Sequence, residues 1–80
     1  MRAIVEFIER DTAYTLKAAI EHRYPTFEYS IIEAKIEPTK ARYGVYLKDS
    51  AEPSTLQFAK IVAYAKGFLE GMQEAAAQMN

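Results

Sequence analysis

The sequence predicts a small two-layer α+β domain with the element order β-α-β-β-α, in which a three-stranded antiparallel sheet carries two helices on one face. Three observations predict this class: an N-terminal stretch rich in Ile, Val and Phe, two neighbouring segments typical of a β-hairpin, and a long C-terminal run of apolar residues at helical spacing. The chain has 80 residues, of which 50% are hydrophobic and 26% charged, so we expect a single α+β domain over residues 1–80.

Residues 2–9 have the composition of a strand, although their alternation is imperfect. The alternative is an α-β-β-α order in which these residues belong to a long N-terminal helix. We expect Asp11 to cap the first helix, because its carboxylate can accept hydrogen bonds from free backbone N–H groups. Pro25 should end that helix, because the residue before a proline avoids the α region.

The best-supported unit is a hairpin formed by residues 27–36 and 41–48, with a loop at 37–40. We expect Ile36 to pair with Ala41, and this register decides which side chains share a face. The inward face would carry Ile32, Ala34 and Ile36 from one strand, and Ala41, Tyr43, Val45 and Leu47 from the other. The outward face would carry Tyr29, Ile31, Glu33 and Lys35, opposite Arg42, Gly44, Tyr46 and Lys48.

Ser54 and Gln57 form an S-x-x-Q capping box at the start of the last helix. A helix over residues 54–79 would be about 39 Å long, whereas a compact domain of this length has a radius of gyration of about 12 Å. We therefore expect the C-terminal turns to overhang the domain. Their apolar stripe has the spacing of a helix-pairing seam, which predicts self-association through Phe68, Leu69, Met72, Ala75, Ala76 and Met79.

The sequence contains no recognisable catalytic or metal site. There is no cysteine and a single histidine, His22, which excludes disulfides, thiolate metal sites and histidine-rich metal sites. Neither a G-x-S-x-G elbow nor a glycine-rich phosphate-binding pattern is present. We therefore expect a protein that is not an enzyme and that uses no cofactor and no metal.

No apolar run approaches the roughly 20 residues that a transmembrane helix requires. Glu6 interrupts any N-terminal signal core. Together with the absence of cysteine, this leads us to expect a cytoplasmic protein that does not contact membranes.

The outward face of the hairpin is the candidate contact surface. Ile4 and Ile8 would extend it if Val5 and Phe7 of the first strand point inward. Exposed apolar patches usually mark interaction sites, and tyrosine and arginine often anchor interfaces. We therefore expect a protein-binding module, an inhibitor or adaptor that forms a homodimer and occludes a surface of another protein. The expected contact residues are Tyr29, Ile31, Arg42, Tyr46 and Lys48.

Two other functions fit the same sequence. The hairpin face could bind nucleic acid, because basic and aromatic side chains alternate along it, but a net charge of −1 weakens the electrostatic attraction to phosphates. The chain could instead be a structural subunit that docks through its C-terminal helix. The sequence leaves open the identity of the partner and which of the two surfaces is used.

Overall fold

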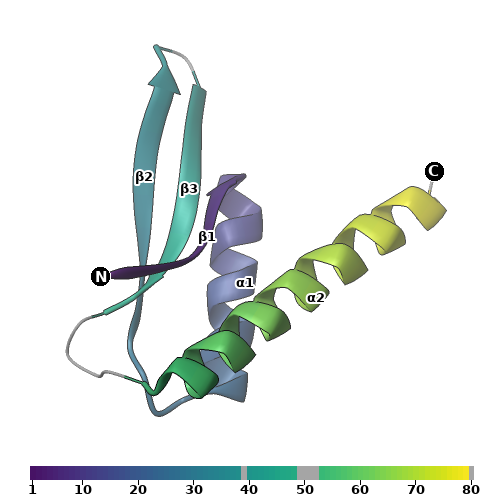
Figure 1. The fold of residues 1–80 in the computed structure, drawn as a ribbon. Helices are drawn as coiled ribbons and strands as arrows, with labels where there is room; N and C mark the ends of the chain where they lie inside the picture. The colour runs from purple at the N-terminus through teal and green to yellow at the C-terminus, as the bar shows by residue number, and fades with distance from the viewer. Residues whose placement is uncertain (39, 49–52, 80) are drawn as a thin grey trace.

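The computed structural model of the chain describes residues 1–38, 40–48 and 53–79, and the side chains of residues 36 and 79 lie outside this description. The elements are β1 (Arg2–Ile8), α1 (Arg10–Arg23), β2 (Tyr29–Glu37), β3 (Lys40–Leu47) and α2 (Thr55–Met79). The strands form one antiparallel sheet in the order β1-β3-β2 (Figure 1). The predicted α+β class and element order are confirmed, and the N-terminal segment is a strand rather than part of a helix. Residue 39 of the predicted hairpin loop and residues 49–52 of the following loop lie outside the described residues.

Both helices pack on one face of the sheet around a shared apolar core. Burying a Leu, Ile or Val side chain contributes about 1.5–3 kcal/mol, so this cluster is the main source of stability. Its members come from α1, β3 and α2 as well as from the edge strands: Ile4, Ala13, Leu16, Ile20, Tyr29, Val45, Leu47, Ile61 and Ala65.

The start of α1 differs from the prediction. The helix begins at Arg10, and its N-cap residue is Glu9, whose side chain makes no capping hydrogen bond. Asp11, the predicted cap, instead lies in the first turn, where a carboxylate interacts favourably with the helix dipole. The physical reason is the short connection: β1 runs to Ile8, so a single residue links strand and helix.

Two other helix boundaries were predicted correctly. The α1 helix ends before Pro25, and the backbone N–H of Tyr24 donates to the carbonyl of Ile20 at 2.7 Å. The capping box of α2 is formed as predicted. The N–H of Gln57 donates to the Ser54 hydroxyl at 3.2 Å, and the N–H of Ser54 donates to the Gln57 side-chain oxygen at 2.9 Å.

The predicted register of the hairpin is wrong by one residue along most of its length. The prediction holds next to the turn, where Glu37 pairs with Lys40, but the register shifts between Lys35 and Glu37. Beyond this irregularity Lys35, and not Ile36, pairs with Ala41. Because side chains alternate between faces, one inserted residue moves the rest of β2 to the opposite face.

The shifted register places Tyr29 and Ile31 on the helix side of the sheet. Tyr29 is only 4% exposed, and its hydroxyl donates to the carbonyl of Tyr24 at 2.8 Å. Ile31 packs against the core, whereas Ile32 and Ala34, predicted to point inward, are exposed. The expectation that Tyr29 and Ile31 face outward is therefore wrong, while the predicted faces of β3 agree with the structure, since Val45 and Leu47 are buried.

The first strand also differs from the prediction. Its pairing with β3 shifts twice, between Ala3 and Val5 and again between Val5 and Ile8. Ile4, which was expected to lie outward, is buried as a result, and Ile8 packs against the core together with Val5. Phe7, which was expected to point inward, is 65% exposed.

The second half of α2 leaves the body of the molecule. Ile61 and Ala65 in the first half are fully buried, but among residues 70–78 every side chain except Met72 is exposed. Figure 1 shows this half extending away from the sheet. The predicted overhang of the C-terminal turns is therefore confirmed, while the predicted self-association through them stays a prediction.

Candidate functional site

The five residues predicted as contacts do not form a single surface. Tyr29 and Ile31 lie on the helix side of the sheet, and Arg42 and Tyr46 belong to the opposite face of β3. Lys48 follows the end of β3, where its ammonium group lies 3.9 Å from a carboxylate oxygen of Glu28 in an exposed ion pair. The proposed contact surface is therefore divided between both faces of the sheet.

On the outer face, Tyr46 is held by contacts within the chain. Its hydroxyl donates to the carboxylate of Glu6 at 2.7 Å, and this hydrogen bond is the main reason that the pKa of Tyr46 is raised. Its ring lies over Gly44, where an added Cβ would come within 2.6 Å of a ring carbon. Gly44 thus leaves the space that the ring occupies, and Glu6 places a carboxylate beside the phenol.

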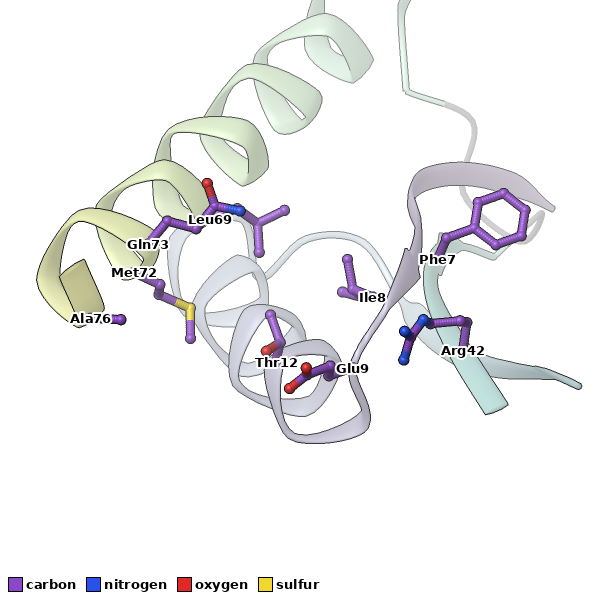
Figure 2. A pocket seen from close by; sticks show the side chains of 9 residues that line it. All are labelled: Phe7, Ile8, Glu9, Thr12, Arg42, Leu69, Met72, Gln73 and Ala76. Carbon is purple, nitrogen blue, oxygen red and sulfur yellow. The ribbon is translucent and has the colours of Figure 1, made fainter. Parts of the chain in front are cut away.

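The structure brings other residues together around a cleft of about 540 Å³. The cleft lies between the second half of α2 and the junction of β1 with α1 (Figure 2). It is lined by side chains of four elements and the one-residue link between β1 and α1: Phe7, Ile8, Glu9, Thr12, Arg42, Leu69, Met72, Gln73 and Ala76.

One wall of the cleft is a single face of α2. Leu69, Met72, Gln73 and Ala76 follow each other at intervals of three, one and three residues, which places them on the same side of a helix. Leu69 still packs against the core, whereas Met72 is half-buried and Ala76 is exposed. The wall therefore becomes progressively more open toward the C-terminal end of the helix.

Phe7 stands on the opposite side of the cleft, beside Arg42 (Figure 2). Its backbone has a φ of 61°, a left-handed conformation that is unusual for a bulky residue. Such conformations cost about 1–3 kcal/mol and persist only where the surrounding structure imposes them. Here the residue lies within the second irregularity of the pairing between β1 and β3. This irregularity therefore holds an aromatic ring at the rim of the cleft instead of in the core.

The lining of the cleft is suited to binding. Its apolar side chains are bordered by one carboxylate, one guanidinium, one hydroxyl and one amide, from Glu9, Arg42, Thr12 and Gln73. Apolar walls with a few polar groups are the usual composition of binding pockets. Among the residues that the structure describes, no three His, Cys, Asp or Glu side chains are grouped as metal ligands.

The set predicted for self-association is only partly gathered at this cleft. Leu69, Met72 and Ala76 line it, whereas the ring of Phe68 packs near that of Tyr64, with centroids 6.3 Å apart. Ala75 is exposed but does not line the cleft, and the side chain of Met79 lies outside the described residues.

The sequence reasoning missed the opposite wall, formed by Phe7, Ile8, Glu9 and Thr12. Strict alternation along β1 assigned Phe7 to the core, and no residue type in that strand signals the two irregularities. The nearest signal was the imperfect alternation of the segment itself.

Comparisons with protein-family models, with curated proteins and with solved structures give no match to this chain. Its function is therefore inferred from the site. In the described part of the chain, neither helix combines the length and the apolar character needed to cross a membrane.

Proposed function

We propose that this chain is a non-enzymatic protein-binding module, acting as an inhibitor or adaptor, that receives an amphipathic helix of a partner protein in the cleft between α2 and β1. By binding that helix, the chain would make the apolar face of the helix inaccessible to other proteins. The observation that carries the proposal is Phe7, which is 65% exposed and held by a strained backbone at the rim of an apolar cleft.

A strained residue that displays an aromatic ring is more informative than an exposed ring alone. Single exposed apolar side chains are common on protein surfaces. Backbone strain, in contrast, is concentrated at ligand-binding and catalytic positions, because the fold gains nothing from it. Phe7 combines both properties and lines the same cleft as the apolar side chains of α2.

The shape of the α2 wall favours a helix as the ligand. An amphipathic helix laid in a groove contacts it through residues at i, i+3, i+4 and i+7, and the wall has this spacing itself. Met72 can adapt to irregular partner side chains because it is flexible and polarisable. The small side chain of Ala76 permits close approach of a second helix axis. Arg42 at the rim would pair with an acidic residue of the partner.

The alternative of nucleic-acid binding has less support. The outer face of the sheet carries Glu6 next to Tyr46, and Lys48 pairs with Glu28. Both carboxylates would repel phosphates.

The alternative of docking through the C-terminal helix becomes part of the proposal, because α2 forms one wall of the cleft. A cytoplasmic location belongs to the proposal as well, since a chain without cysteine gains nothing from an oxidising compartment.

The first experiment identifies the partner and locates the contact. A photo-crosslinking amino acid is introduced at Gln73, which lines the cleft, and separately at Gln78, another exposed glutamine of the same helix that does not. We expect a specific crosslinked protein from position 73 and none from position 78. Crosslinks from position 78 alone would contradict the proposed site.

The second experiment measures the affinity of that purified partner for two matched variants. Phe7→Ala removes an aromatic ring that is 65% exposed, and Leu56→Ala removes an apolar side chain that is 66% exposed but lies outside the cleft. We expect Phe7→Ala to weaken binding at least about tenfold, as for an interface anchor, and Leu56→Ala to leave it within about twofold. Equal affinities for the two variants would refute the role of the cleft.

A further inference from the structure

The outer edge of β2 is free, and the strand is regular from Tyr29 to Lys35. The strand lies at one side of the sheet, and within the described residues no other segment hydrogen-bonds to its outer edge. Its pairing with β3 runs without interruption from Tyr29 to Lys35. The opposite edge, β1, is shorter and shifts its register twice. Irregular edges resist pairing with another chain, whereas long regular edges favour it.

The far end of the hairpin also lacks support from the rest of the molecule. Figure 1 shows β2 and β3 extending past β1 and α1 at that end. Residues 32–35, 37, 38 and 40 are all exposed, and Ile32 is 39% exposed. Two-stranded hairpins are marginally stable in water, and a further strand stabilises them. A strand added at the edge of β2 would therefore stabilise the end of the hairpin that extends past β1 and α1.

The charges of β2 are complementary to those of a second, antiparallel copy of the same strand. Glu33 and Lys35 are exposed, carry opposite charges and lie two residues apart, so they are on the same face of the sheet. We propose that a second copy of the chain adds its β2 antiparallel to this edge, with a two-fold axis through Ala34, to form a six-stranded sheet. Glu33 then lies opposite Lys35 of the second copy, and Lys35 lies opposite Glu33 of the second copy.

Neighbouring registers are less favourable. An axis through Glu33 sets that residue against its own copy, and an axis through Lys35 sets two ammonium groups against each other. An axis through Ile32 sets Glu33 against Ile31 and forms no ion pair. An axis through residue 36 would set Lys35 against Glu37 of the second copy, but then only residues 35–37 of the two strands overlap, across the register shift. Opposite charges directly across two strands stabilise their pairing and like charges destabilise it. The axis at Ala34 is the one that combines two ion pairs with a long overlap of the two strands. Residues 31–37 of both copies overlap in this arrangement, and the central pairs, formed by residues 33–35, lie in the regular part of the strand.

The test is the molar mass of the full chain in solution, by size-exclusion chromatography with light scattering. The wild type should be a dimer of twice 9.1 kDa, which is 18.2 kDa. Lys35→Glu replaces both ion pairs by repulsion and should weaken the dimer at least about tenfold. The double variant Glu33→Lys/Lys35→Glu exchanges the charges and should restore dimerisation. Lys66→Glu makes the same charge change at an exposed position on α2 and should leave the dimer unchanged.

Several results would overturn this interface. They are a wild-type mass of 9.1 kDa at all concentrations, a dimer that Lys35→Glu leaves intact, or a double variant with a native circular dichroism spectrum that stays monomeric. The interface does not include the cleft, so Phe7→Ala should remain dimeric. Loss of partner binding and loss of dimerisation are thereby distinguished.

Discussion

The two halves of α2 have the same apolar periodicity but different surroundings. In the first half, Ile61 and Ala65 are fully buried against the core. In the second half, Met72 is only half-buried and Ala76 is exposed, although both continue the apolar side of the helix. The difference arises because the sheet and α1 lie beneath the first half only. Periodicity thus shows which residues share a face, and the remaining fold decides whether that face meets the core or a partner.

The largest expected effect contrasts one residue from each half. Ile61→Ala should lower the free energy of unfolding by about 2–5 kcal/mol, because it leaves a cavity in the core. Met72→Ala should lower it by less than about 1 kcal/mol, because the side chain is only partly buried. Chemical denaturation of both variants measures the difference. Equal losses would show that the second half packs as tightly as the first.

The second prediction concerns Phe7, which lines the cleft on the side opposite the second half of α2. Phe7→Gly should raise the free energy of unfolding by about 1 kcal/mol, because glycine adopts a positive φ without strain. This corresponds to a rise in Tm of about 4–8 °C for a domain of this size. Thermal unfolding of Phe7→Ala is the control, since it removes the ring but keeps the strain. A gain in Phe7→Ala as large as in Phe7→Gly would show that ring exposure, and not the backbone, limits stability.

A smaller effect compares the glycines of α2. Apart from the adjoining residues and backbone of the helix itself, no atom lies within 4 Å of a Cβ added at Gly67 or Gly71, so alanine fits at both positions. Replacing a helical glycine by alanine contributes up to about 1 kcal/mol. We expect most of this gain in global stability from Gly67→Ala and less than half of it from Gly71→Ala, because the exposed end of a helix unfolds locally before the core does. The gains are measured by urea unfolding. A larger gain for Gly71→Ala than for Gly67→Ala would contradict the difference between the two halves of the helix.

Tyr29 predicts an effect of pH on stability in alkaline solution. Burial raises the pKa of Tyr29 to about 12, with further contributions from Glu21 and Tyr24. A raised pKa means that the folded state holds the phenol proton more tightly than the unfolded state does. The resulting stability is complete below the unfolded pKa of 10.0 and is lost as the pH rises toward about 12. Denaturation at increasing pH should show this loss in the wild type. In Tyr29→Phe, which has no phenol to ionise, the free energy of unfolding should fall less between pH 10 and pH 12.

Much of the fold could be predicted from the sequence because its signals are local. The capping box at Ser54, the end of α1 before Pro25 and the alternation of β3 each depend on neighbouring residues only. The registers of β1 and β2 could not be predicted. Single-residue irregularities leave no mark in composition, yet each one changes which side chains reach the core.

The candidate site divides in the same way. Its α2 wall, with Leu69, Met72 and Ala76, was found from helical periodicity, although it was assigned to self-association. The wall containing Phe7 was not found, because it depends on the irregular pairing of β1. The predicted contacts at Tyr29 and Ile31 failed for the corresponding reason in β2, where the register shifts between Lys35 and Glu37.

The most direct test of the cleft is an NMR titration of the isotopically labelled protein. The partner identified by crosslinking is purified and added, and the methyl resonances of the labelled protein are followed. The proposed function predicts that the largest shifts occur at Ile8, Leu69 and Met72, which line the cleft. The methyl groups of Ile32 on the hairpin and Leu56 at the start of α2 should shift little. Largest shifts at Ile32 or Leu56, with Met72 unperturbed, would show that the partner binds elsewhere.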